Sequence, residues 1–215
     1  MRREPWKLKD VVMMAILGVL FAVVYMAVFY GGTAISVALT PLGLSAFGFE
    51  LIYGVWFMAA TIAAYIIRKP LSDPPAIIIR KPGAALITEV LASAIELLMG
   101  NSGGATVVLT GLIQGVGCEL GFAVFRYRKY NLLSMALSGV FAAVCIFCYE
   151  LYYLSYYLLA PTMLAAQLAV RFASAVVFSG VIAKLACDGL ARTGVLRSYA
   201  VGARLAPVSI DDEEE

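Results

Sequence analysis

The sequence predicts an all-α integral membrane protein with six transmembrane helices and both termini in the cytoplasm. Of its 215 residues, 62% are hydrophobic and 14% are charged, whereas soluble domains contain about 45–50% apolar and about 25% charged residues. The apolar residues form continuous runs without polar–apolar alternation, which favours helices over a membrane β-barrel. The net charge of only +2 argues against a nucleic-acid-binding protein. The chain has no histidine, so it lacks the residue that most often binds metal ions.

Six apolar segments are long enough, or nearly so, to cross a bilayer as helices, which takes about 20 residues each. They are residues 11–30, 50–67, 84–99, 105–125, 132–157 and 163–186. A cleaved signal peptide is the alternative for the first segment, but its apolar run is longer than the roughly 7–15 residues of a signal core. The chain therefore divides into a cytoplasmic segment 1–9, a transmembrane domain 10–190 and a cytoplasmic tail 191–215 with an acidic end.

Lysines and arginines mark alternate connections between these segments. They precede the first segment, lie between the second and third and between the fourth and fifth, and follow the sixth. The connections 31–49, 100–104 and 158–162 contain neither residue. Because cytoplasmic loops are enriched in basic residues, we expect these three connections outside the cell. The pattern requires an even number of spans, which supports the count of six.

A short repeat lengthens the connection between the second and third segments. The sequence Ile-Ile-Arg-Lys-Pro occurs at residues 66–70 and again at 78–82. Prolines between the two copies prevent a continuous helix. We interpret the repeat as a local duplication that inserts residues into a cytoplasmic loop near 68–82, and contact of this loop with a partner is the alternative.

Five glutamates lie within or at the ends of the predicted spans, where an ionisable group is costly unless it faces protein or water. They are Glu50, Glu89, Glu96, Glu119 and Glu150. Arg171 is the basic residue placed deepest in a span, since Lys184 can extend to the interface. The surplus of acids predicts either bound protons or a cationic ligand. We expect one internal ion pair, of Arg171 with Glu89 or Glu119.

Three of these glutamates are predicted in the outer half of the bundle. Measured from the outer ends of their spans, Glu50 lies within the first turn, Glu96 about one turn deep and Glu150 about 10 Å deep. Glu89 and Glu96 are seven residues apart and share a helix face, with small residues between them. This arrangement predicts a carboxylate-lined cavity that opens to the outside.

Aromatic side chains accompany the acids. Tyr53 follows Glu50 by three residues, with Trp56 close by, and Tyr149 and Tyr153 are near Glu150 on one helix. A carboxylate beside an aromatic face can hold a flat organic cation by ion pairing and cation–π attraction. For the neighbouring tyrosines 152, 156 and 157 we favour an aromatic belt at the membrane interface.

Two amides, Asn101 and Gln114, can add neutral hydrogen bonds to such a ligand. The predicted substrate-binding residues are Glu50, Tyr53, Trp56, Glu89, Glu96, Asn101, Gln114, Tyr149, Glu150 and Tyr153. No nucleotide-binding motif, catalytic triad or phosphate-binding loop is present, so no enzyme, no cofactor and no energy source are expected. A transporter of this kind needs an ATPase from a partner.

Small residues at helical spacing predict close helix packing. The fourth span contains GxxxG sequences at 111–115 and 117–121, which allow the backbones of two helices to approach. In the first span, Ala15, Gly18 and Ala22 form a patch that suits packing on another membrane helix, within the chain or in a partner. We assign this patch to a partner interface.

Several longer motifs carry a resemblance to a known family. They are ExxYGxWF at 50–57, PGAAL at 82–86, GN at 100–101, GxxQGxGxE at 111–119 and TGVL at 193–196. Together with six helices and short outer connections, they resemble the S-components of energy-coupling factor (ECF) vitamin transporters, most closely the YkoE branch. Relative to that family, residues 71–82 look like an insertion.

The resemblance implies an S-component-like bundle in the plasma membrane that binds thiamine or its hydroxymethylpyrimidine part. It also implies two partners, a transmembrane coupling subunit and an ATPase with two nucleotide-binding domains. Thiamine suits acids beside aromatic faces, because it combines a permanent positive charge with an aromatic ring. We expect Glu50, Glu96 or Glu150 to offset that charge and the connection 31–49 to act as the gate. The alternative is a stand-alone proton-coupled transporter or channel for a small organic cation.

Overall fold

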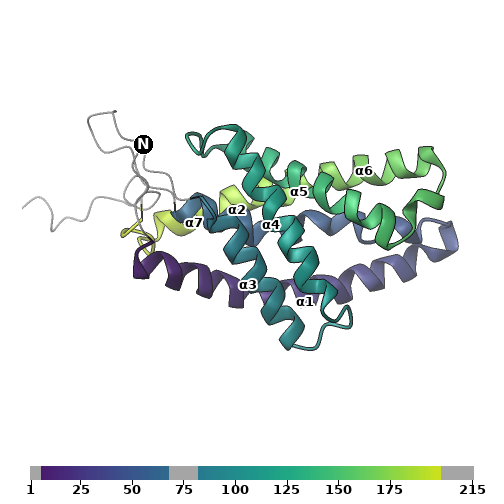
Figure 1. Cartoon of the computed structure of the whole chain (residues 1–215), viewed down its shortest axis with the longest axis horizontal. Helices are drawn as coiled ribbons and strands as arrows, with labels where there is room; N and C mark the ends of the chain where they lie inside the picture. The colour runs from purple at the N-terminus through teal and green to yellow at the C-terminus, as the bar shows by residue number, and fades with distance from the viewer. Residues whose placement is uncertain (1–5, 68–81, 200–215) are drawn as a thin grey trace, which may run out of the picture.

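The computed structural model describes residues 6–67 and 82–199, and in this part of the chain it is a bundle of helices without strands (Figure 1). Its α-helices are α1 (Leu8–Leu39), α2 (Met58–Ile67), α3 (Ala84–Leu98), α4 (Thr106–Val124), α5 (Leu132–Tyr153), α6 (Pro161–Ala175) and α7 (Ala183–Arg192). Short 3-10 segments are η1 (Thr40–Leu42), η2 (Ser45–Phe47), η3 (Glu50–Phe57) and η4 (Tyr156–Leu158), and η5 (Val176–Ile182) is π-helical. Most of the repeat at 66–82 and the acidic end of the tail lie outside the described residues.

The prediction of six membrane-crossing segments is confirmed. Five helical segments are long and apolar enough to span a bilayer: Leu8–Leu42, Ser45–Ile67, Thr106–Val124, Leu132–Tyr153 and Pro161–Arg192. The sixth is α3, which has only 15 residues. The last span is continuous through α6, η5 and α7, so a π-helical stretch lies inside one long helix rather than at its end.

The first span is longer than predicted. The sequence predicts a helix over 11–30 and a connection over 31–49, but α1 continues to Leu39. The polar side chain of Thr33 is accommodated in this extension, since its hydroxyl donates to the carbonyl of Phe29 in the preceding turn. Pro41 then stands at the start of η1, where its missing N–H cannot continue the α-helix. The outer connection is therefore confined to residues 40–49, and only this shorter segment is available for the predicted gate.

The second span is not one regular helix. Residues 50–57 form the 3-10 helix η3, and α2 begins only at Met58. A 3-10 helix has three residues per turn, so side chains three apart lie in one row. Glu50, Tyr53 and Trp56 are spaced by three and therefore project from the same edge of η3.

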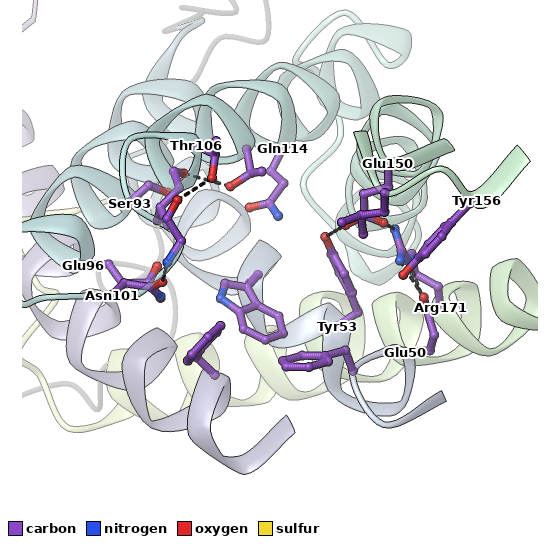
Figure 2. Close-up of a pocket in the computed structure, with 17 residues that line it drawn as sticks. Glu50, Tyr53, Ser93, Glu96, Asn101, Thr106, Gln114, Glu150, Tyr156 and Arg171 are labelled. Atoms are coloured by element: carbon purple, nitrogen blue, oxygen red, sulfur yellow. Dashed lines mark hydrogen bonds and ion pairs between the residues drawn. The ribbon is translucent and has the colours of Figure 1, made fainter. Parts of the chain in front are cut away.

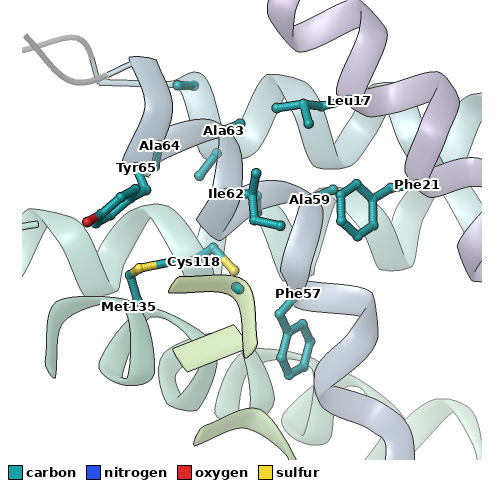
Figure 3. Close-up of a cluster of buried hydrophobic side chains, with 14 of the residues drawn as sticks. Leu17, Phe21, Phe57, Ala59, Ile62, Ala63, Ala64, Tyr65, Cys118 and Met135 are labelled. Carbon is teal, nitrogen blue, oxygen red and sulfur yellow. The ribbon is translucent and has the colours of Figure 1, made fainter. Parts of the chain in front are cut away.

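Helix α2 forms the centre of the bundle. Every residue from 59 to 67 is buried, and small alanines at four of these positions let the neighbouring helices come close. Figure 3 shows this segment with Leu17 and Phe21 of α1 on one side and Cys118 and Met135 on the other. The outer surfaces of α1, α4 and α7 carry exposed leucine and valine side chains, as expected of helices that face lipid.

The glycines of α4 confirm the predicted close packing. A Cβ atom added at Gly117 would lie 2.4 Å from the Cα atom of Ala142, and one added at Gly121 would lie 2.3 Å from the Cα atom of Ser138. Both neighbours are backbone atoms of α5 that no side-chain rotation can move. The GxxxG pair at 111–115 similarly faces α3.

The fold divides the patch of Ala15, Gly18 and Ala22, for which the sequence predicts a partner interface. Gly18 and Ala22 are buried, and a Cβ atom at Gly18 would lie 3.1 Å from Leu91 of α3. Only Ala15 remains exposed. The assignment of Gly18 and Ala22 to a partner surface is therefore wrong, because they already serve the packing of α1 on α3.

The ends of the described chain meet at one end of the bundle (Figure 1). The hydroxyl of Tyr199 donates to the carbonyl of Lys9 at 2.6 Å, and the Lys9 ammonium donates to the carbonyl of Ser198. Glu119 accepts the backbone N–H of Gly83 at 2.7 Å near the start of α3. These contacts place both ends on the side that carries the basic residues, in agreement with the predicted cytoplasmic termini.

Candidate functional site

A cavity of about 350 Å³ lies at the opposite, outer end of the bundle. Phe49, Gly103 and Tyr156 come from the three outer connections and all line it. Asn101 also comes from one of these connections, and Leu154 directly follows α5. The other lining residues come from α1, η3, α3, α4, α5 and α6: Phe29, Glu50, Tyr53, Trp56, Ser93, Glu96, Thr106, Val107, Thr110, Gln114, Glu150 and Arg171. Figure 2 shows Glu96 and Asn101 on one side of this space and the cluster of Glu50, Glu150 and Arg171 on the other.

Arg171 binds two glutamates at once. Its Nε and Nη2 atoms each lie 2.6 Å from an oxygen of Glu50, and its Nη1 atom lies 2.6 Å from Oε2 of Glu150. Arg171 is only 1% exposed. The expected pairing with Glu89 or Glu119 is therefore wrong. Arg171 pairs with Glu50 instead because η3 packs on α6. At this contact the N–H of Gly54 donates to Ser174 at 2.9 Å, which brings Glu50 next to the arginine.

Tyr53 completes this ion cluster. Its hydroxyl donates to Oε1 of Glu150 at 2.5 Å. The guanidinium of Arg171 lies over its ring, 3.8 Å from the ring centroid. Arg171 is thus hydrogen-bonded to Glu50 and ion-paired with Glu150, and its single positive charge balances one of the two negative charges.

Glu96 stands on the other side of the cavity without a cation. It accepts a hydrogen bond of 2.7 Å from the side-chain amide of Asn101, whose oxygen in turn accepts the N–H of Gly103 at 2.8 Å. Across the described ranges 6–67 and 82–199, no Lys or Arg forms an ion pair with Glu96. The side-chain amide of Gln114 makes no hydrogen bond within that same part of the chain. Free hydrogen-bonding capacity therefore faces the cavity here.

An aromatic wall connects the two sides. The ring of Trp56 lies 5.4 Å from that of Tyr53 and 6.1 Å from that of Phe49, and Phe29 continues the row at 6.1 Å from Phe49. Tyr156 closes the wall from η4. Such rings present flat faces on which an aromatic ligand can stack.

The lining has an excess of acid groups. Glu50, Glu96 and Glu150 are opposed by Arg171 alone among the lining residues. With all four groups ionised, two negative charges are not balanced. A cavity of this composition favours a positively charged ligand with an aromatic ring, by ion pairing and cation–π attraction.

Three of the predicted binding residues lie outside the cavity. Glu89 is fully buried next to Tyr25. The cavity reaches Ser93, which lies between Glu89 and Glu96 on α3 and also packs on Gly111 of α4, but it does not reach Glu89. Tyr149 and Tyr153 stack on each other at 5.1 Å and do not line the cavity, and Tyr153 is 54% exposed.

Tyr156 lines the cavity, whereas the sequence predicts that it belongs to an aromatic belt at the membrane interface. The sequence predicts a helix up to residue 157, but α5 ends at Tyr153 and Ser155 takes a left-handed conformation with φ of 56°. This turn redirects the chain, so that Tyr156 points back toward Arg171 (Figure 2). No feature of the sequence marks Ser155 as a turn residue of this kind.

The polar wall contributed by α4 was also missed in part. Thr106, Thr110 and Gln114 all line the cavity, and their spacing of four places them on one helix face. This spacing is visible in the sequence and could have identified the two threonines. Phe29 and Phe49 carry no such signal, since aromatic residues are common throughout apolar spans.

Comparison with known proteins agrees with this architecture. The family model described as "ABC-type cobalt transport system, permease component" matches residues 9–73 and 75–145. The chain is 36% identical over 202 residues to the "Putative HMP/thiamine permease protein YkoE" of Bacillus subtilis (strain 168), which covers 94% of this chain and 93% of that protein. A solved structure, "Crystal structure of an S-component of ECF transporter", matches with a TM-score of 0.83 and 35% identity, over 94% of this chain and 93% of the solved chain.

These relatives belong to transport systems and are not enzymes, and the solved S-component shares the helical bundle over nearly its whole length. The resemblance that the motifs of η3, α3 and α4 indicated is thereby confirmed. The chain belongs to the family of ECF-transporter S-components that includes YkoE, multi-pass membrane subunits that work with separate coupling and ATPase subunits.

Proposed function

We propose that this S-component binds thiamine, or the hydroxymethylpyrimidine from which thiamine is made, in the outer cavity for import by its partner subunits. The observation that carries the proposal is the aromatic wall between Glu96 and the Arg171 cluster. The relative from Bacillus subtilis is named for the same two ligands. The cavity, at about 350 Å³, is within the usual range of small-molecule sites, about 300–1,000 Å³.

Glu96 is the carboxylate proposed to offset the thiazolium charge of thiamine. Glu50 and Glu150 already share Arg171, whereas among the described residues Glu96 is held by the neutral amide of Asn101 and by no cation. The pyrimidine ring stacks on the aromatic wall, and Gln114 provides a hydrogen bond to its polar edge. This assignment narrows the three acids expected from the sequence to one.

The exposed face of α1 is the proposed contact for the transmembrane coupling subunit. Ala15, Ile16, Val19 and Leu20 line a second, apolar hollow on this face. An apolar helix surface that includes a small residue, here Ala15, permits the close approach of another membrane helix. The proposed contact surface therefore lies on the face of α1 next to Gly18 and Ala22, and it shares only Ala15 with the surface that the sequence predicts.

Calorimetry with the purified protein tests the ligand. We expect thiamine to bind, and Glu96→Gln to weaken its binding at least tenfold, since a lost buried ion pair is worth about 1.4 kcal/mol or more. Uncharged hydroxymethylpyrimidine is expected to lose much less affinity in the same variant. Glu119→Gln is the matched control, because Glu119 binds Gly83 and does not line the cavity.

Two results would contradict the proposal. One is binding of neither ligand together with proton flux in liposomes, which supports the stand-alone proton-coupled transporter. The other is an equal loss of thiamine affinity in the Glu119→Gln control. An equal loss of affinity for both ligands in Glu96→Gln would still place the ligand next to Glu96. It would contradict the role of Glu96 as the counter-charge, because hydroxymethylpyrimidine is uncharged.

A further inference from the structure

A buried polar cluster lies beside the cavity and joins three elements of the bundle. Tyr25 of α1 and Glu89 of α3 are both 0% exposed. They meet the backbone at the change from η3 to α2, at the carbonyl of Trp56 and the N–H groups of Ala59 and Ala60. None of the ligand contacts proposed above involves the Glu89 side chain, so its presence requires a separate explanation.

The hydrogen bonds of Tyr25 indicate where the protons are. A tyrosine hydroxyl has one proton to donate and two lone pairs that accept. The Tyr25 oxygen lies 2.8 Å from the carbonyl oxygen of Trp56, which can only accept, and it receives the N–H of Ala59 at 3.2 Å. Its third neighbour is Oε2 of Glu89 at 3.0 Å. Since the hydroxyl proton already goes to Trp56, this last bond needs a proton from Glu89.

The surroundings of Glu89 support the same conclusion independently. Its Oε1 atom is buried and has no hydrogen-bond partner among residues 6–67 and 82–199, and Oε2 accepts one N–H, from Ala60 at 3.2 Å. A carboxylate anion in this position would lose its hydration without replacement, whereas a neutral acid loses far less.

In the described part of the chain, the other groups near Glu89 offer no positive charge. They are the Tyr25 hydroxyl from α1, backbone N–H groups from α2, Cys118 and Gly115 from α4, and Glu96 on its own helix. Lys and Arg residues of the described ranges form no ion pair with it.

We propose that Glu89 is a protonated, neutral carboxylic acid that donates to Tyr25, and that this pair positions Trp56 in the wall of the cavity. The Tyr25 hydroxyl holds the carbonyl of Trp56, and Glu89 holds the hydroxyl. Glu89 is thus a positioning residue that acts on the ligand through Trp56. The protonation state stands on the geometry alone, and only the effect on the ligand rests on the proposed function.

Infrared spectroscopy of the ligand-free, full-length protein at neutral pH tests the proton. The difference spectrum between the wild type and Glu89→Gln is expected to contain the C=O stretch of a protonated carboxyl group. Tyr25→Phe keeps the acid but removes its acceptor, so the same band should move to higher frequency. Glu96→Gln is the control and should leave the Glu89 band in place. Carboxylate bands alone in the Glu89→Gln difference spectrum, or no response to Tyr25→Phe, would overturn the proposal.

Tryptophan emission tests the positioning. The sequence has two tryptophans, and Trp6→Phe leaves Trp56 as the single reporter. In this background Glu89→Gln, which keeps an N–H donor toward Tyr25, should preserve the Trp56 emission better than Glu89→Ala. Tyr25→Phe should weaken thiamine binding about three- to tenfold, the equivalent of one net hydrogen bond.

Equal emission changes in the Gln and Ala variants would overturn the role of the donated proton in placing Trp56. A wild type that binds neither vitamin would instead contradict the proposed function, and the infrared result would still decide the protonation of Glu89. The two failures are therefore distinguishable.

Discussion

Arg171→Met is expected to destabilise the protein strongly, because it leaves two buried carboxylates without their cation. Arg171 makes three contacts of 2.6 Å, two with Glu50 and one with Glu150. Glu50 is almost completely buried, like Arg171 itself. Methionine is unbranched and uncharged, so the substitution keeps the apolar stem of the side chain and removes the guanidinium with its charge.

The magnitude follows from the cost of breaking a buried ion pair by removal of one partner, about 3–5 kcal/mol. For a chain of this size 1 kcal/mol corresponds to about 2–4 °C in the unfolding midpoint. The variant should therefore unfold roughly 6–20 °C below the wild type. A triple variant that also carries Glu50→Gln and Glu150→Gln has no unpaired charge, and it should recover most of this loss.

Thermal unfolding in detergent, followed by circular dichroism, measures both effects. Arg192→Met is the control, since Arg192 is exposed at the end of α7 and should change the midpoint very little. The reasoning is refuted if Arg171→Met unfolds with the wild type. It is also refuted if the triple variant is no more stable than the single one, because the unpaired charges would then not be the cause.

Three further substitutions test the cavity and the packing around it. Tyr53→Phe keeps the ring under Arg171 but removes the hydrogen bond to Glu150. The free energy of unfolding should fall by about 1.5–3 kcal/mol, and an unchanged unfolding midpoint would contradict a stabilising role of that bond. Trp56→Ala should weaken thiamine binding about 2- to 30-fold in calorimetry while Trp56→Phe retains part of the affinity, and equal affinities in both would remove stacking as the cause. Gly117→Ala should cost at least about 1–3 kcal/mol through the clash with α5, with Gly31→Ala, which has open space around it, as the control.

The charge surplus seen in the sequence proved to be only part of the explanation for the cavity. Each of the five glutamates has a partner among the described residues. Glu50 binds Arg171, Glu89 contacts Tyr25, Glu96 binds Asn101, Glu119 accepts a backbone N–H group, and Glu150 binds Tyr53. The excess therefore does not require a visiting cation by itself. What supports a cationic ligand is the position of Glu96, which lines an open space and whose hydrogen-bond partner, in the part of the chain that the structure describes, is the neutral amide of Asn101.

The predicted site was most accurate where local spacing decided the geometry. Glu50, Tyr53 and Trp56 follow one another at intervals of three and line the cavity together. Glu96 and Asn101 are close in sequence and hydrogen-bond directly. Tyr149 and Tyr153 share a face, as expected, but that face is turned away from the cavity.

The amino-acid sequence by itself determined the membrane class, the number of spans, their orientation and the end of the bundle at which the acids gather. These properties add up residue by residue, because hydropathy and charge act on each segment independently of its neighbours. The tertiary structure alone decided which acid Arg171 neutralises, how far α1 extends and that Tyr156 turns inward. The ion pair depends on residues as far apart in sequence as Glu50 and Arg171, and no short stretch of sequence contains both of them. The direction of Tyr156 depends on the backbone turn at Ser155, a residue type that does not mark such a turn.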